Sequence, residues 1–325
     1  MKTMVRLALV VSVSVAALLK TQAVVDDESP LAARALPLLY VANASDSTGS
    51  LLGFVTAYDP GSCGSVAPLL TIRGANTLMH DNQSLAFDPS GNLLVQNFLS
   101  EAMTLVFAPK ASGNVAPSRF FSTGNRDKQS IAVDSKGYVF IVCVQALVME
   151  VIAPGASGTV SPLRTISFDG YPISVAVDDE DNVIVGVEYS GSNLDNAIEV
   201  FGPQAQEGSP KRIIRGSNTG LGGNDSTVPI VAFSPVNDRI YVGVSTPNVG
   251  QGTPPNPNAH VSVFPSDGNG NISPVRTISG PLTGLNGTSI QGLAGNPQTG
   301  EVFVLTTPFT PGPPARFHHR FRAVG

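Results

Sequence analysis

A unit of roughly 45 residues recurs along this chain, and the repeat constrains the fold more than any other feature. One part of the unit is an apolar segment that ends in Val-Phe or a similar pair, followed by Pro, a polar turn and usually a second Pro. Its copies begin at residues 57, 105, 151, 200 and 263. The other part is a short apolar segment that in its clearest copies runs from Ser to Asp, with Gly or Asn following. Its copies cover residues 84–95, 130–141, 174–185, 230–242 and 289–304.

Each unit predicts four short strands. The Val-Phe segment and the segment after its polar turn form one hairpin. In the other part, Asp bonds the backbone of a tight turn, while Gly or Asn tolerates positive φ. Because one small twisted sheet cannot bury both faces alone, sheets repeated at this period stack around an axis. We therefore expect an all-β fold, a β-propeller of four-stranded antiparallel blades.

The number of blades follows less directly from the repeat. The chain opens at residues 38–43 with what would be a second strand lacking a first, and it closes after Leu305 with a first and second strand lacking the outer pair. We favour six blades, the last of them incomplete. In the alternative, five blades form and the segment near Ile290 completes the first.

Residues 1–23 have the pattern of a secretory signal peptide. Lys2 and Arg6 precede an apolar run over residues 7–19, and Ala23 offers a small residue for cleavage. We expect a secreted or periplasmic protein. The run is shorter than the roughly 18 residues of a membrane span, so no integral membrane segment is expected in the mature chain. The rest divides into an N-terminal segment (24–37), the propeller domain (38–307) and an irregular C-terminal tail (308–325).

Charge bears on the class of partner. The formal net charge is −5, and it becomes −8 once Lys2, Arg6 and Lys20 leave with the leader. An acidic protein repels a phosphate backbone, so we expect no nucleic acid partner.

The repeat resembles that of NHL-like and related SMP-30/gluconolactonase-like β-propellers, whose units have the form Val-Phe-x-Pro, Gly-Asn-x-x-Pro-x-Arg-Thr-Ile-Ser-Gly and Ile-Ala-Val-Asp-x-x-Gly-Asn. The resemblance covers residues 38–307 and is greatest to secreted bacterial proteins of unassigned activity. It implies a six-bladed propeller. Because these families include protein-binding modules, lactonases and lyases, it implies no single activity.

Two further residue types have predicted places in the repeat. Cys63 falls in a turn and Cys143 at a strand end two repeats later, so we expect two free thiols. A charged side chain on an outermost strand discourages edge-to-edge pairing, and we give this structural role to Arg119, Arg164, Arg212 and Arg276.

The face where the chain enters each innermost strand is the expected binding site, because these loops and those between second and third strands meet around the channel mouth. Gln83 and Gln129 occupy equivalent positions in two repeats and could donate hydrogen bonds to a polar ligand. The predicted ligand-binding residues are Gln83, Gln129, Tyr171, Glu188 and Asn193.

Carboxylates on the same loops suggest an alternative, a site for a divalent cation such as Ca²⁺. The candidate ligands are Asp127, Glu188, Asp195 and Asp225. Such an ion could activate water or polarise a lactone carbonyl, so the alternative function is a metal-dependent hydrolase of the lactonase/SMP-30 kind. The acids of those lactonases cannot be matched here residue by residue.

No residue is assigned a catalytic role. His80 and His260 stand alone on predicted loops, and no nucleophile elbow accompanies them. We therefore favour an exported binding or interaction module over an enzyme. The partner expected is a protein, a glycan or a small polar ligand.

Overall fold

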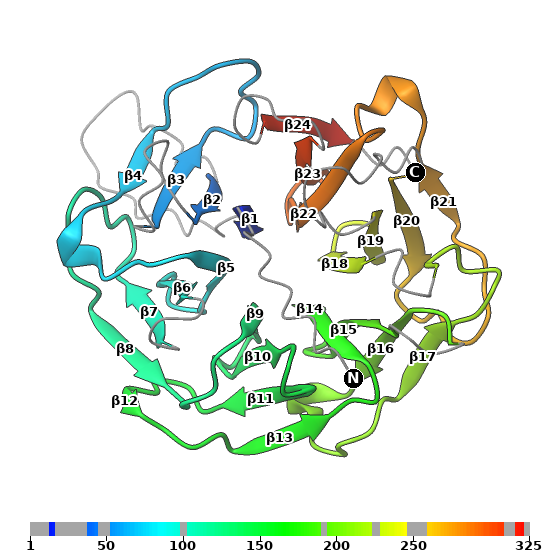
Figure 1. The fold of residues 1–325 in the computed structure, drawn as a ribbon, viewed down its shortest axis with the longest axis horizontal. Coiled ribbons are helices and arrows are strands. Elements are labelled where there is room, and N and C mark those ends of the chain that lie inside the picture. The colour runs from blue at the N-terminus through cyan, green and yellow to red at the C-terminus, as the bar shows by residue number, and fades with distance from the viewer. Residues whose placement is uncertain are drawn as a thin grey trace, which may run out of the picture.

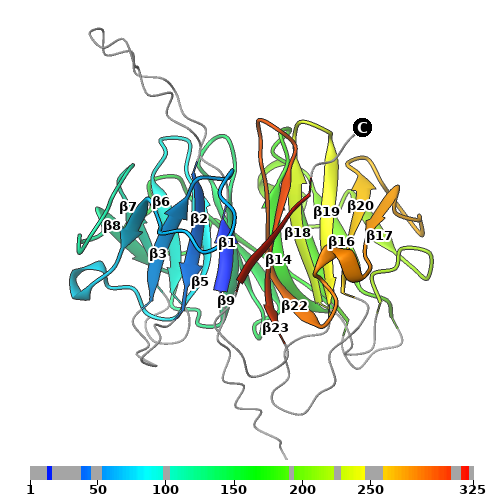
Figure 2. The same ribbon diagram turned by 90° about the horizontal axis from the view of Figure 1, so that it is seen from above.

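A computed structural model describes residues 13–16, 38–44, 53–97, 103–189, 194–222, 228–245, 259–308 and 316–321. These residues form six sheets around a central axis (Figure 1). Turned by 90°, the strands run across the thickness of the ring (Figure 2). The only helical elements among the described residues are the 3-10 segments η1 (Ala75–Thr77), η2 (Pro203–Ala205) and η3 (Pro281–Thr283).

The first three sheets follow one another in the chain. Sheet 1 contains β1 (Val13–Ala16), β2 (Leu39–Asn43), β3 (Phe54–Tyr58) and β4 (Leu70–Ile72). Sheet 2 contains β5 (Asn82–Phe87), β6 (Leu93–Asn97), β7 (Met103–Phe107) and β8 (Arg119–Ser122), with β12 (Gly158–Thr159) added in parallel. Sheet 3 contains β9 (Lys128–Val133), β10 (Val139–Cys143), β11 (Val148–Ile152) and β13 (Arg164–Ser167).

The other three sheets complete the ring. Sheet 4 contains β14 (Tyr171–Val177), β15 (Val183–Glu188), β16 (Ala197–Phe201) and β17 (Arg212–Arg215). Sheet 5 contains β18 (Val228–Ser234), β19 (Arg239–Ser245), β20 (His260–Pro265) and β21 (Arg276–Ile278). Sheet 6 contains β22 (Thr288–Gly295), β23 (Val302–Pro308) and β24 (Arg316–Phe321).

The prediction of an all-β propeller with four-stranded antiparallel blades is confirmed. Five sheets are complete blades, which favours the alternative of five blades over the six expected. The last sheet has three described strands, as expected of an incomplete blade. The segment near Ile290 is β22, which pairs with β23 and not with the first sheet.

Near each end of the chain, one strand lies where none was expected. β1 falls inside the predicted leader and pairs with β2, with Ala16 opposite Tyr40. The tail is not wholly irregular, because Arg316–Phe321 forms β24 against β23. In each case a segment without the repeat motif pairs with an edge strand of the propeller. Pairing is favourable because an uncovered edge leaves backbone donors and acceptors unpaired.

The core lies between neighbouring sheets, and β15 shows why. Val183, Val185 and Val187 pack toward sheet 3 in one buried cluster, whereas Ile184 packs toward sheet 5 in another. This alternation is the period of a strand with both faces covered. No described helix is long and apolar enough to cross a membrane.

The turns after the innermost strands form as predicted. The Asp88 Oδ1 atom accepts hydrogen bonds from the amides of Ser90 (3.0 Å) and Asn92 (2.9 Å), and Gly91 adopts φ 79°. Asp134 and Asp178 repeat the arrangement. These turns lie where the innermost strands end. The chain therefore enters the innermost strands on the opposite face of the ring, which is the expected channel mouth.

The repeated arginines on the outermost strands have a role besides discouraging edge-to-edge pairing. Three of them, Arg119, Arg164 and Arg212, each reach the outer hairpin of the next sheet and donate a hydrogen bond to a backbone carbonyl there. The pairs are Arg119 with Ala156 (2.8 Å), Arg164 with Gln204 (2.7 Å) and Arg212 with Ser266 (2.7 Å). They therefore tie neighbouring blades together at the rim.

Candidate ligand-binding site at the channel mouth

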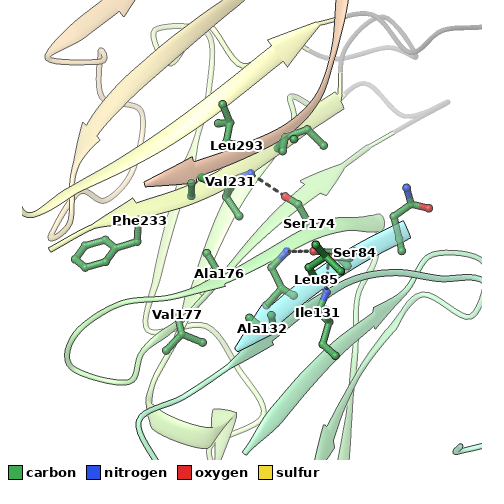
Figure 3. A pocket seen from close by; sticks show the side chains of 18 of the residues that line it. Ser84, Leu85, Ile131, Ala132, Ser174, Ala176, Val177, Val231, Phe233 and Leu293 are labelled. Carbon is green, nitrogen blue, oxygen red and sulfur yellow. Dashed lines mark hydrogen bonds between the residues drawn. The ribbon is translucent and has the colours of Figure 1, made fainter. Parts of the chain in front are cut away.

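A cavity of ≈ 230 Å³ occupies the centre of the ring. Its lining comes from the innermost strands β5, β9, β14, β18 and β22, which belong to five different sheets (Figure 3). Because the strands run along the cavity, successive residues of each strand form successive layers of its wall.

Serines hold these strands to one another. The Ser84 Oγ accepts a hydrogen bond from the Ile131 amide (3.3 Å), and the Ser130 Oγ accepts one from the Val175 amide (3.2 Å). The Ser174 Oγ accepts from the Val231 amide (3.0 Å) and donates to the Pro229 carbonyl (2.9 Å), as Figure 3 shows for the first of these two bonds. An innermost strand has a free edge toward the channel, so the neighbouring serine satisfies an amide that would otherwise lack a partner.

Glutamines line the end of the cavity where the chain enters the innermost strands. Gln83 and Gln129 both lie in the lining, as their equivalent positions suggested. Gln83 is buried, whereas Gln129 is partly exposed. On β14 the same position is taken by Ile173.

A third glutamine, Gln291, was missed by sequence reasoning. It lies in the same lining, and its Nε2 donates to the hydroxyls of Ser289 (2.9 Å) and Thr307 (3.2 Å). The sequence alignment matched Ser289 with Ser84, but the pairing of β22 with β23 shifts between Ile290 and Gly292. Counting back from the turn after the strand, rather than forward from the serine, would have found Gln291.

The other end of the cavity is apolar. Its lining there is Phe87, Val133, Val177 and Phe233, all of them half-buried. Phe87 is held by an edge-on contact with Tyr40 at 5.0 Å between ring centroids. A ligand entering from the glutamine end would meet amides first and hydrocarbon below them.

Tyr171 and Glu188 are register partners at the mouth end of β14 and β15. Tyr171 is 39% exposed, and neither residue is part of the cavity lining. The structure thus places them on the rim of the same face, outside the glutamine layer. Asn193 lies outside the described residues.

The predicted metal ligands that the structure describes, Asp127, Glu188 and Asp195, do not form a metal-binding cluster with one another. The described residues contain no group of three or more His, Cys, Asp or Glu side chains placed to hold a metal ion. Asp127 and Asp195 lie on separate loops of this face, and Asp225 lies outside the described residues. The cation site stays a prediction.

A buried charged group lies directly behind Gln129. Lys128 is fully buried, and burial lowers the pKa of its amine, whereas the charge of Glu150 opposes that shift. The Glu150 carboxylate accepts hydrogen bonds from the Thr123 hydroxyl (2.7 Å) and from the Asn125 side chain. These interactions fix the loop that enters β9, and the one sequence signal for them is a lysine in an otherwise uncharged strand.

A second buried group fixes the end of β15. The Tyr189 hydroxyl donates to the Glu199 carboxylate (2.8 Å), and the Arg215 guanidinium lies 3.4 Å from the same carboxylate and 4.1 Å above the Tyr189 ring. Burial and the nearby charge of Glu199 raise the pKa of Tyr189 to about 12. Tyr189 therefore stays a neutral donor, and it anchors the chain next to Glu188.

Comparison with solved structures supports the fold. The chain is similar to a protein of unknown function from Bacteroides caccae, with a TM-score of 0.55 and 15% identity over 86% of this chain and 85% of that chain. It is also similar to the WD40 repeats of RRP9, with a TM-score of 0.53 and 9% identity over 83% of this chain and 70% of that chain.

Sequence comparison adds no family. No protein-family model and no curated protein matches the chain. Similarity to solved structures at such low identity shows a shared fold alone. The propeller fold is thus shown, while membership of the NHL-like or SMP-30/gluconolactonase-like families stays a prediction.

Proposed function

We propose that this protein is an exported propeller that binds a polar ligand at the glutamine end of its central channel. The observation that carries the proposal is the layer formed by Gln83, Gln129 and Gln291, which places amide groups from three sheets around one opening. Amides both donate and accept hydrogen bonds, so such a layer suits a neutral ligand rich in hydroxyl or peptide groups.

The surroundings support the same assignment. Tyr171 and Glu188 stand on the rim of this face, where they could contact the part of a ligand that stays outside the cavity. The lower, apolar part of the lining could take an apolar portion of the ligand.

Export is proposed from the leader-like N-terminus. Because β1 lies within that segment, cleavage after residue 23 would leave sheet 1 with three strands.

The test is a binding screen with labelled protein on arrays of neutral oligosaccharides and of peptides, followed by calorimetric titration of the strongest hit. We expect a saturable hit that weakens about tenfold or more in a Gln129→Ala/Gln291→Ala double variant, because two hydrogen-bonding groups are lost. Gln298→Ala is the matched control, since Gln298 is exposed on the turn face.

Two results would overturn the proposal. One is the absence of any saturable hit on either array. The other is a hit that the double variant and the Gln298→Ala control bind as tightly as the unaltered protein, because the channel mouth would then play no part in binding.

A further inference from the structure

The aspartate turns after the innermost strands differ in one detail, the partner of the second carboxylate oxygen. In sheet 2 the Asp88 Oδ2 accepts a hydrogen bond from the Asn92 side chain (2.8 Å). In sheet 4 the Asp178 Oδ2 accepts one from the Asn182 side chain (2.8 Å). The asparagine stands four residues after the aspartate in both turns, and the Oδ1 atoms accept backbone amides. Both oxygens of each of these carboxylates are therefore bonded.

The turn of sheet 3 lacks this donor. Tyr138 stands four residues after Asp134, and only its backbone amide bonds the Asp134 Oδ1 (2.8 Å). The Asp134 Oδ2 is buried and has no hydrogen-bond partner in the part of the chain that the structure describes. The residue as a whole is 3% exposed, so bulk water does not replace the missing donor. An ionised carboxylate with an unbonded, buried oxygen costs free energy.

A second carboxylate lies next to Asp134 in the neighbouring sheet. Asp181, in the turn of sheet 4, accepts hydrogen bonds from the Ser135 amide (2.8 Å) and the Ser135 hydroxyl (2.8 Å). Its backbone is in the left-handed region (φ 65°), where Gly91 and Gly137 stand in the turns of sheets 2 and 3. A residue with a side chain costs free energy in that region. We call Asp134, Ser135 and Asp181 the turn interface of sheets 3 and 4.

The charges around Asp134 favour its neutral form. Burial raises the pKa of Asp134 and the charge of Asp181 adds to the shift, whereas two backbone hydrogen bonds and Lys136 oppose it. Lys136 is exposed and lies 3.6 Å from the Asp181 carboxylate. From sheet 2 the residue that approaches this turn is Pro89, beside Gly137, and it brings no charge. The charged groups that act on Asp134 are thus Asp181 from sheet 4 and Lys136 from its own turn.

The turn interface lies at the apolar end of the central cavity. Val133 and Val177, which line that end, directly precede Asp134 and Asp178 in the chain. Figure 3 shows Val177 among the lining side chains. A change in the turn interface would therefore act on the two strands, β9 and β14, that form this part of the cavity wall.

We propose that the turn interface is a pH-sensitive contact between sheets 3 and 4, tight at acidic pH and looser at neutral pH. With a proton on Oδ2, Asp134 is uncharged and does not repel Asp181. Without it, a buried charge lacking a donor stands beside a second carboxylate. The folded protein holds this proton more tightly than the unfolded chain does. The contribution of the interface to stability therefore falls as the pH rises above the ordinary pKa of aspartate, about 3.9.

The test is urea denaturation of the full chain at pH 7 and at pH 4.5. The Asp134→Asn variant keeps Oδ1 and places an uncharged group at Oδ2. Its urea midpoint should exceed that of the unaltered protein by about 0.3 M at pH 7, and the excess should shrink at pH 4.5. Asp88→Asn is the matched control. Its midpoint should not rise at pH 7, because both oxygens of Asp88 are bonded and Arg119 lies 3.7 Å away.

A second variant, Tyr138→Asn, supplies the donor that the other two turns have. Tyr138 also packs against the core, so this variant lowers the midpoint at both pH values. The readout is the midpoint at pH 4.5 minus that at pH 7, which should be smaller than in the unaltered protein, as in Asp134→Asn. Hydrogen exchange gives a local readout. After correction for the intrinsic rate, residues 134–138 and 178–182 should exchange faster at pH 7 than at pH 4.5, and this difference should disappear in Asp134→Asn.

Either of two results would overturn the proposal. One is an Asp134→Asn variant whose urea midpoint at pH 7 equals or falls below that of the unaltered protein, because the charge of Asp134 would then not weaken the interface. The other is exchange in the two turns that responds to pH equally in the unaltered protein and in Asp134→Asn.

Discussion

At the scale of single residues, burial decides what each reactive group of this chain can do. Cys63 is exposed in the outer turn of sheet 1, whereas Cys143 is fully buried at the end of β10. Both thiols are free, as expected from their positions in the repeat. Burial, together with the nearby charge of Glu150, raises the pKa of Cys143 to about 12. The two thiols should therefore differ in reactivity, because the thiolate is the reactive form.

The difference can be measured with a disulfide reagent such as DTNB at pH 8. Native protein should react quickly at one thiol, and a Cys63→Ser variant should lose that fast reaction. The second thiol should react only after unfolding in guanidinium chloride. Fast reaction of both thiols in native protein would show that Cys143 is accessible and that this part of sheet 3 is packed differently.

At the scale of elements, the inner ring depends on serines that link one innermost strand to the next. Ser174 makes the most of these links, because its hydroxyl both accepts from the Val231 amide and donates to the Pro229 carbonyl. Ser84 and Ser130 each accept a single strand-to-strand bond. Losing a buried hydrogen bond costs about 1 kcal/mol, and leaving its partner unsatisfied adds to that.

The Ser174→Ala variant should lower the free energy of unfolding by about 1–2 kcal/mol, measured by urea denaturation followed by circular dichroism. Ser130→Ala should cost about 1 kcal/mol or less. Ser217→Ala, at an exposed turn, is the control and should change stability by less than about 0.5 kcal/mol. A Ser174→Ala variant as stable as this control would mean that the serine links do not hold the inner ring together.

At the scale of the whole molecule, the repeat predicts the turns and strands that short-range interactions determine. It does not predict the strands and side chains whose positions depend on contacts between distant parts of the chain. The turn at Asp88 and the strands around it follow from short-range chemistry, so they could be predicted. β1 and β24 lack the repeat motif, and they are placed by sheet edges that need a partner. Gln291 was hidden by an irregularity that only the pairing of β22 with β23 reveals.

The same argument holds for the candidate site. Gln83 and Gln129 could be predicted because equivalent residues of a repeat meet at one end of a ring. The buried pair of Lys128 and Glu150 could not, because the two residues come from different strands and only the folded sheet brings them close. Sequence periodicity thus predicts which residues meet at one end of the ring better than it predicts the buried groups behind them.

The most direct test of the account is hydrogen exchange, measured by mass spectrometry, on the protein with and without the strongest hit from the arrays. Binding at the channel mouth should slow exchange in the segments that enter the innermost strands, residues 80–83, 125–129 and 168–172. The turns on the opposite face, residues 88–92 and 134–138, should be unchanged. Slower exchange confined to those turns, with no change at the mouth, would contradict the assignment of the glutamine end as the binding face.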